Sequence, residues 1–301
     1  MANASASGAP AETDKVWLIT GCSSGMGREF AFAALREGYR VVTTARDPKT
    51  LREFVDGFPE RARALALDVT DKRQVESVVA ATIAEFGRID VLVNNAAYGY
   101  LAAIEEGDEE DVRAMFETNF WGLLAMTRAV LPHMRRQRSG HIVQNSSQAG
   151  LMSKPGTGYY STTKWAVEAL TEALWEEVAP FGIKVTALEP GPYRTDWAGR
   201  SMKRAKKPIA DYAAVHARAQ MISDMDGQQP GDPKGAAWAL IELVRAKNPP
   251  RQILMGKLVL DTYRAKLDSI RASLDEWEAL TIQADFAPEP SGAPGGPKAP
   301  K

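Results

Sequence analysis

Short apolar runs alternate with longer amphipathic stretches over most of this 301-residue chain. The short runs have the continuous apolar character of strands that are buried on both faces of a sheet; they are Val16–Thr20, Arg40–Thr44, Ala64–Leu67, Val91–Val93, His141–Gln144 and Lys184–Leu188. The stretches between them repeat apolar residues at helical spacing; they are Arg28–Glu37, Asp71–Phe86, Glu109–Met134 and Tyr160–Pro180. This alternation predicts an α/β fold, a doubly wound parallel sheet of about seven strands with helices on both faces.

Beyond Leu188 the pattern is less regular. We expect, in chain order, one or two helices over the sheet, a further helix, a last strand and a charged helix; they cover Met202–Met225, Pro233–Lys247, Gln252–Met255 and Thr262–Leu280. The chain ends, residues 1–13 and 287–301, lack periodicity and are rich in small residues or proline, which indicates disorder. We therefore expect one domain over residues 14–286, with a substrate-covering segment at about 198–230 and a C-terminal helix at about 258–284.

The composition excludes several classes of function. Hydrophobic residues make up 45% of the chain and charged residues 25%, and the net charge is −1, so nothing favours nucleic acid or an acidic membrane surface. Cys22 is the only cysteine, which rules out an intramolecular disulfide and a cysteine-based zinc site. The histidines do not have metal-ligand spacing, so we expect no metal. Without a secretory signal or a membrane-length apolar stretch, a cytoplasmic protein that does not bind membranes is expected.

A candidate acid–base pair lies at the start of one predicted helix. Tyr160 and Lys164 are four residues apart, so their side chains project from the same helix face. A phenol has an ordinary pKa of about 10, and a fixed ammonium nearby favours the phenolate and lowers that value. Proton exchange with a carbonyl or alcohol oxygen then becomes feasible near neutral pH. A hydroxyl of the preceding pair, Ser146-Ser147, would hold that oxygen by a hydrogen bond.

A glycine-rich turn follows the first predicted strand. It reads Thr20-Gly21-Cys22-Ser23-Ser24-Gly25-Met26-Gly27 and opens the first helix. Glycines let the backbone approach a phosphate closely, and the helix N-terminus attracts negative charge. The turn therefore predicts a dinucleotide site, although glycines at such turns also occur for steric reasons alone.

The end of the second strand indicates which dinucleotide binds. NAD-binding folds place an acidic residue there for the ribose hydroxyls, whereas this chain has Arg46, a side chain suited to a phosphate. Arg46 favours NADP(H), and NAD(H) stays open because Asp47 is adjacent. Arg46 could instead only end the strand at the surface. Asp68, at the end of the third strand, could contact the adenine or begin a turn with Thr70.

Together these motifs resemble the short-chain dehydrogenase/reductase family, in its compact NADP-preferring branch, and are similar to hydroxysteroid and retinol dehydrogenase-like members. The resemblance covers residues 16–197 and follows the family's order of motifs. The motifs are the TGxxxGxG turn, Asn94-Asn95-Ala96-Ala97, Asn119, Ser147, Tyr160 with Lys164, and Pro190-Gly191. Ala97 departs from the family, which usually has glycine there. The resemblance implies a Rossmann-type domain and a homodimer or homotetramer that pairs through the helices at 109–134 and 160–180.

The resemblance also implies roles for single residues. Tyr160 would be the general acid in reduction and the general base in oxidation, and Lys164 would lower its pKa and bind the nicotinamide ribose. Ser147 would orient the substrate oxygen, and Asn119 would support a water that links Lys164 to solvent. The cofactor would contact Tyr160, Lys164, Gly21, Ser23, Ser24, Gly25, Met26, Arg46, Asp68, Val69, Asn94, Ala96, Pro190, Gly191 and Thr195.

The implied chemistry is hydride transfer between a nicotinamide and a small-molecule ketone or secondary alcohol. Aromatic residues near the expected pocket favour a bulky apolar or aromatic substrate; the residues assigned to it are Gln148, Tyr193 and Trp197. The basic cluster Lys203-Arg204-Ala205-Lys206-Lys207 reads either as a solvated helix face or as a landing site for an acidic substrate.

Two other functions fit the same motifs. One is a catalytically idle dinucleotide-binding sensor or scaffold, although mere binding requires no acid–base phenol. The other is a different reaction on the same scaffold, such as epimerisation or dehydration, against which the compact length weighs.

Overall fold

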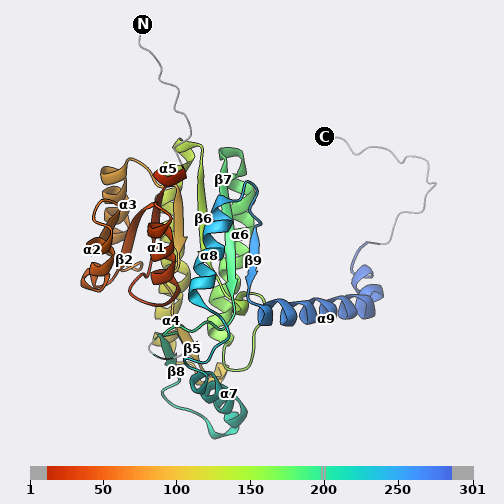
Figure 1. Cartoon of the computed structure of the whole chain (residues 1–301). Coiled ribbons are helices and arrows are strands. Elements are labelled where there is room, and N and C mark those ends of the chain that lie inside the picture. The colour runs from red at the N-terminus through yellow and green to blue at the C-terminus, as the bar shows by residue number, and fades with distance from the viewer. Residues whose placement is uncertain (1–11, 198, 200, 287–301) are drawn as a thin grey trace, which may run out of the picture. The chain divides into compact units, whose positions relative to one another are not determined.

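A parallel sheet forms the centre of the fold. The computed structural model describes residues 12–197, 199 and 201–286. The sheet has seven strands in the order β3-β2-β1-β4-β6-β7-β9, and every neighbouring pair is parallel (Figure 1). The strands are β1 (Val16–Ile19), β2 (Arg40–Ala45), β3 (Ala62–Ala66), β4 (Val91–Asn94), β6 (Gly140–Asn145), β7 (Ile183–Pro190) and β9 (Gln252–Met255). The order reverses between β1 and β4, so the carboxyl ends of the strands open a crevice there. The predicted fold class is confirmed.

Helices cover both faces of this sheet (Figure 1). On one face lie α1 (Gly25–Arg36), α2 (Arg52–Gly57) and α8 (Pro233–Arg245); on the other lie α3 (Lys72–Phe86), α5 (Leu123–Gln137) and α6 (Gly158–Val178). Successive residues of β1 point to opposite faces. Trp17 and Ile19 join the core under α1 and α8, whereas Leu18 joins the core under α3 and α5. Because both faces are buried, the strand reads as a continuous apolar run.

The predicted helix Glu109–Met134 is not continuous. α4 (Glu109–Phe116) is followed by a π-helical segment, Glu117–Gly122, and then by α5. A π turn is wider than an α turn and often marks a functional position. Here it carries Asn119, whose amide bonds to the backbone of Tyr98. Apolar residues also occur within the π-helical segment, so the spacing of apolar residues along the sequence does not reveal the π turn.

The segment after β7 contains a strand where the sequence predicts only helix. β8 pairs with β5 in a small parallel sheet, and a helix follows it; these elements are β5 (Gly99–Leu101), β8 (Met202–Arg204) and α7 (Ala213–Asp224). Lys203 and Lys206 form ion pairs with Asp111 of α4, at 2.9 and 2.8 Å. The basic cluster is therefore not a solvated helix face, because Lys203 lies in β8 and two of the three lysines attach this segment to α4.

The chain divides into two compact units, one that ends at Leu260 and one that begins at Asp261. Within the described residues, the second unit is mainly the rest of α9 (Lys257–Ile282). The predicted disordered ends, 1–13 and 287–301, lie outside the described residues, except that residues 12 and 13 belong to a 3-10 turn, Glu12–Asp14. The single domain at 14–286, with its covering segment and C-terminal helix, stays a prediction. None of the described helices combines the length and apolar character that crossing a membrane requires.

His141, in β6, is buried, and only one of its two ring nitrogens has a hydrogen-bond partner among the described residues. It is 3% exposed, and its Nε2 lies 3.0 Å from the hydroxyl of Thr186, which itself donates to the carbonyl of Pro250. Nε2 therefore carries the proton, and Nδ1 has no partner within the part of the chain that the structure describes. Burial lowers the pKa of His141 to about 3.

We predict that His141 makes the fold sensitive to acid. In the unfolded chain the imidazole titrates near pH 6.5, so between there and about pH 3 the unfolded state binds more protons. The free energy of unfolding then falls with falling pH, by up to about 1.4 kcal/mol per pH unit. His141→Gln should remove this part of the loss, which urea unfolding near pH 7 and near pH 5 would measure. Identical pH dependence of the two proteins would contradict the prediction.

Candidate active site

Tyr160, Lys164 and Ser147 share one site beside the carboxyl end of β6. Tyr160 and Lys164 lie on the buried face of α6, 6% and 2% exposed, and the Lys164 Nζ is 5.8 Å from the centre of the Tyr160 ring. Ser147 follows β6, and its hydroxyl lies close enough to the Tyr160 phenol to lower its pKa. The three side chains that the sequence marks as an acid–base group are thus brought together.

Burial controls the protonation of this group. It raises the pKa of Tyr160 to about 12, which outweighs the lowering by the Ser147 hydrogen bond. It lowers the pKa of Lys164 to about 8, while the Glu168 carboxylate acts in the opposite direction. The Lys164 Nζ donates to the carbonyl oxygen of Asn145 at 2.7 Å. The expected net lowering of the phenol pKa is therefore not found in the protein alone, because desolvation of the phenolate is the larger effect.

Asn119 connects the π-helical segment to α6. Its Oδ1 accepts from the backbone N–H of Tyr98 at 3.0 Å, and its Nδ2 donates to the Tyr98 carbonyl at 2.9 Å. The same Nδ2 lies 3.3 Å from the hydroxyl of Thr163, which stands next to Lys164 in the sequence. Asn119 thus positions the loop against α6; its role toward a water stays a prediction.

The amide of Asn95 ties the glycine turn to the ends of two further strands. Its Nδ2 donates to the carbonyl oxygens of Thr20 and Gly21, at 2.9 and 3.0 Å, and its Oδ1 accepts from Nδ2 of Asn145 at 2.9 Å. A Cβ at Gly27 would lie 2.3 Å from Asn95 Nδ2, so the close approach requires glycine. The sequence marks Asn95 only as part of a motif and gives no signal for Asn145.

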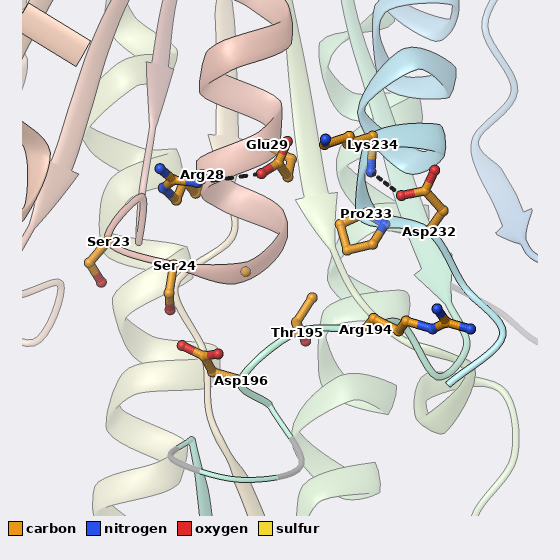
Figure 2. Close-up of a pocket in the computed structure, with 11 residues that line it drawn as sticks. Ser23, Ser24, Arg28, Glu29, Arg194, Thr195, Asp196, Asp232, Pro233 and Lys234 are labelled. Atoms are coloured by element: carbon orange, nitrogen blue, oxygen red, sulfur yellow. Dashed lines mark hydrogen bonds and ion pairs between the residues drawn. The ribbon is translucent and has the colours of Figure 1, made fainter. Parts of the chain in front are cut away.

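A cavity of about 480 Å³ lies at the N-terminus of α1 (Figure 2). Among predicted cofactor residues, Ser23, Ser24, Gly25 and Thr195 line it; the lining residues that the sequence did not indicate are Arg28, Glu29, Arg194, Asp196, Asp232, Pro233 and Lys234. Figure 2 shows Arg28 and Glu29 on α1, Thr195 and Asp196 on the loop after β7, and Asp232 at the start of α8. Tyr160 is not among the lining residues, so this cavity does not include the acid–base group.

The start of α1 fits a pyrophosphate. Its first turn has no acidic residue, and no side-chain hydrogen bond from Ser24 caps it, so its first N–H groups face a potential ligand. Gly21 and Gly25 have φ of +71° and +60°, a conformation that favours glycine. A Cβ at Gly21 would also lie 3.0 Å from the backbone of Ala96. This cradle of close backbone approaches is what a dinucleotide requires.

Arg46 and Asp68 follow β2 and β3. Arg46 is exposed and forms no hydrogen bond or ion pair with any other described residue. The adjacent Asp47 turns to its own chain, since its Oδ1 accepts the N–H of Lys49 at 3.0 Å. Asp68 Oδ1 accepts the N–H and the hydroxyl of Thr70, at 2.9 and 2.7 Å, so Asp68 begins a turn, as the alternative interpretation had it.

Asn94 directs its side chain into the protein. Its Nδ2 donates to the hydroxyl of Thr127 and to Oε1 of Gln144, at 3.0 and 2.9 Å. Ala96, two residues later, donates its N–H to the hydroxyl of Thr20 at 3.0 Å. Any contact of these two residues with a cofactor stays a prediction.

The other predicted cofactor residues have packing roles. Pro190 ends β7, and Gly191 donates its N–H to the carbonyl of Met255 at 3.2 Å. Val69 is buried, and Met26 packs against the core under α1 and α8. Their contacts with a cofactor likewise stay predictions.

Trp197 is the predicted substrate residue that lies against Tyr160. The centroids of the two rings are 5.3 Å apart. Gln148 directly follows Ser147 and begins a short 3-10 turn. Tyr193, in contrast, packs against the core under α1 and α8 and pairs with Gly231 through an isolated β-bridge. Its ring therefore packs against the core, and its contact with a substrate stays a prediction.

A buried carboxyl pair next to Lys164 carries no signal in the sequence. Glu168 of α6 and Glu189 of β7 lie close enough for their charges to interact, and Gln252 donates to Glu189 at 3.0 Å. Burial raises the pKa of both carboxyl groups, and the charge of Glu168 raises that of Glu189 further. Two such carboxyl groups hold a proton more firmly as a pair than either would alone.

Residues 15–206 match the short chain dehydrogenase family. The chain is 40% identical over 269 residues to the oxidoreductase BOA17 of Botryotinia fuckeliana, which covers 89% of this chain and 98% of that protein. It is 38% identical over 246 residues to a 3-ketodihydrosphingosine reductase of Bacteroides thetaiotaomicron, which covers 81% of this chain and 89% of that protein.

Solved structures of the same family share the fold. A short-chain dehydrogenase from Streptomyces avermitilis has a TM-score of 0.85 and 40% identity, and covers 90% of this chain and 100% of that one. A short chain dehydrogenase/reductase from Burkholderia phymatum in complex with NAD has a TM-score of 0.75 and 26% identity, with 86% and 95% covered. A serine dehydrogenase complexed with NADP+ has a TM-score of 0.70 and 26% identity, with 80% and 94% covered. Nicotinamide cofactors of both kinds thus occur among the structural neighbours.

We predict that Gly27→Ala disrupts the glycine turn. Its Cβ would lie 2.3 Å from Asn95 Nδ2 and 2.4 Å from the Gly21 carbonyl oxygen, which a hydrogen bond holds together. The free energy of unfolding should fall by about 1–3 kcal/mol, and binding of NADPH, followed by fluorescence titration, should weaken. Gly57→Ala is the control, since nothing lies within 4 Å of a Cβ there. Equal losses in the two variants would argue against a special role of the turn.

Proposed function

This chain belongs to the short chain dehydrogenase family and is an NAD(P)-dependent oxidoreductase, and we propose that it transfers a hydride between NADP(H) and a bulky apolar or aromatic ketone or secondary alcohol. The observation that carries the proposal is the buried Tyr160 phenol, with the Ser147 hydroxyl close enough to lower its pKa and the Lys164 ammonium 5.8 Å from the centre of its ring. Acid–base chemistry at a substrate oxygen uses such a phenol, whereas binding of a dinucleotide alone does not. This argues against an idle sensor or scaffold.

Tyr160 is the general acid in the direction of reduction. Its raised pKa keeps it protonated at neutral pH, so that it can donate a proton to the substrate carbonyl oxygen. Ser147 would hold that oxygen by a hydrogen bond, and the Lys164 ammonium would stabilise the phenolate that remains. In oxidation Tyr160 would act as the general base. The bound nicotinamide supplies or accepts the hydride.

NADP(H) is the preferred cofactor in this proposal. The turn that contains Gly21 and Gly25 would hold the pyrophosphate at the start of α1. The free guanidinium of Arg46 suits the additional ribose phosphate of NADP(H). Asp47 does not oppose the binding of this phosphate, because its carboxylate accepts the N–H of Lys49. NAD(H) is the alternative cofactor.

A bulky apolar substrate is supported by the surroundings of Tyr160. The ring of Trp197 lies 5.3 Å from it, centre to centre, and Gln148 follows Ser147 directly. The relative from Bacteroides thetaiotaomicron is named for the reduction of a ketone. A small polar substrate would gain little from an aromatic wall.

We also propose that the protein is a homodimer or homotetramer that pairs through α4, α5 and α6. The exposed aromatic side chains Trp121 and Trp165, 51% and 47% exposed, support an interface there. A cytoplasmic location stays a prediction of the sequence.

Tyr160→Phe should abolish turnover and leave NADPH binding almost unchanged, because it removes only the proton donor. A loss of at least about a hundredfold in kcat is expected for removal of a general acid. A panel of ketones and alcohols with NADPH and NADP+ provides the assay, and NADPH binding is titrated by fluorescence. Tyr159→Phe is the matched control: that phenol donates to the backbone carbonyl of Ile104, away from Ser147. Full activity of Tyr160→Phe would refute the role of the phenol. If the natural protein binds NADPH but turns over no substrate of the panel, the idle scaffold would be favoured.

Arg46→Ala should raise the KM for NADPH about tenfold or more, because a charge-assisted contact with a phosphate is lost. The KM for NADH should change by less than about twofold, since NADH lacks that phosphate. Arg52→Ala is the control; among the described residues this exposed arginine pairs only with Asp56 of its own helix, at 3.1 Å. Equal effects of Arg46→Ala on both cofactors would remove the assignment of NADP(H).

A further inference from the structure

α9 carries an apolar stripe that a single helix cannot bury by itself. Leu267, Ile270, Leu274 and Trp277 follow one another at intervals of three, four and three residues, and they are 46, 43, 63 and 55% exposed. This spacing is the a and d pattern of a coiled coil, in which the apolar seam of one helix packs against a second helix. The stripe therefore points to a helical partner.

The charges that flank the stripe change sign along the helix. Arg264 and Arg271 flank its N-terminal half, and Glu278 flanks its C-terminal half, where Asp275 and Glu276 add further negative charge. Neither Arg264 nor Glu278 forms a hydrogen bond or ion pair with another residue in the described ranges. The gradient does not serve the helix itself, because the macrodipole favours acidic residues at the start and basic ones at the end. α9 has no acidic residue in its first turn and no basic residue in its last.

We propose that α9 pairs with the α9 of a second copy of this chain as an antiparallel coiled coil. With Leu267 opposite Trp277 of the second copy, and Ile270 opposite Leu274 of the second copy, the stripe of each helix covers the other. The two-fold symmetry of such a pair repeats both contacts, so one patch serves as its own partner. This contact is additional to the pairing through α4, α5 and α6 and does not depend on it.

Charge complementarity selects the antiparallel orientation. In the stated register Arg264 lies beside Glu278 of the second copy, and symmetry repeats this opposite-charge contact. Arg271 lies beside Arg271 of the second copy, and this one like-charge contact is unfavourable. A parallel pair would instead place Lys266 beside Arg271 twice and would bring Arg264 near no acidic flank. The gradient of charge is therefore matched only when the two helices run in opposite directions.

Cysteine crosslinking in the full-length protein tests the pairing. In the proposed register Ser273 lies beside its symmetry mate at the edge of the seam, whereas Ala272 faces away from the second helix. A short bismaleimide should therefore crosslink the Ser273→Cys variant into a dimer and leave the Ala272→Cys variant monomeric in a denaturing gel. The natural thiol of Cys22 is fully buried, so the unmodified chain gives the background. If neither variant forms a crosslinked dimer, the proposal is overturned in favour of another occupant of the stripe, such as the chain's own first unit. If both variants form dimers equally well, the crosslinks report random collision and the proposal is overturned as well.

A charge exchange tests the orientation. Glu278→Arg added to Ser273→Cys would place two arginines at each flanking contact, and crosslinking should fall roughly three- to tenfold. Adding Arg264→Glu restores opposite charges and should recover the original yield. A sedimentation series over protein concentration should show the same loss and recovery of one association step. If Arg264→Glu fails to restore the crosslinking that Glu278→Arg lowers, the antiparallel register is overturned. Neither experiment uses turnover as a readout.

Discussion

The hydrogen bonds of Asn95 are the constraint on which the site depends. Its side chain holds the turn after β1 through the carbonyl groups of Thr20 and Gly21, and it accepts from the amide of Asn145 at the end of β6. The backbone carbonyl of Asn145 in turn accepts from the Lys164 ammonium. The glycine turn and the lysine are thus joined through the side chain of Asn95 and through Asn145.

Desolvation accompanies this tight arrangement. Burial raises the pKa of Tyr160, lowers that of Lys164 and raises that of Glu189, in each case toward the neutral form. A phenol that is neutral at pH 7 is a proton donor, which suits reduction of a carbonyl group. The lysine and the buried carboxyl pair then lie close enough for their charges to depend on one another. The electrostatics of the site are therefore a property of the group rather than of single residues.

α9 follows a different rule from the helices around the sheet. Those helices bury their apolar faces against strands of the same unit, and their stability comes from that packing. The stripe of α9 contains Leu274 and Trp277, which are large and exposed. Its opposite charges sit at opposite ends of the stripe, and this arrangement is one that a copy of the helix in reverse orientation would satisfy.

Local pattern in the sequence was enough to predict the alternating elements, the parallel sheet, and the meeting of Tyr160 and Lys164 on one helix face. Strand and helix periodicities depend on neighbours only a few residues apart, and they survive in any sequence that folds this way. The glycine turn could also be predicted from the sequence, because Gly21 and Gly25 occupy a backbone conformation that other residues rarely adopt.

The tertiary structure alone decided the rest. The π turn at Asn119, the pairing of β5 with β8 and the bond between Asn95 and Asn145 join residues that are far apart in the chain or interrupt a pattern that looks continuous. The protonation of Tyr160 could not be predicted either, since a lysine four residues away suggests a lowered pKa while burial raises it. The burial of Tyr160 depends on atoms from many segments of the chain, and these segments come together only in the folded protein.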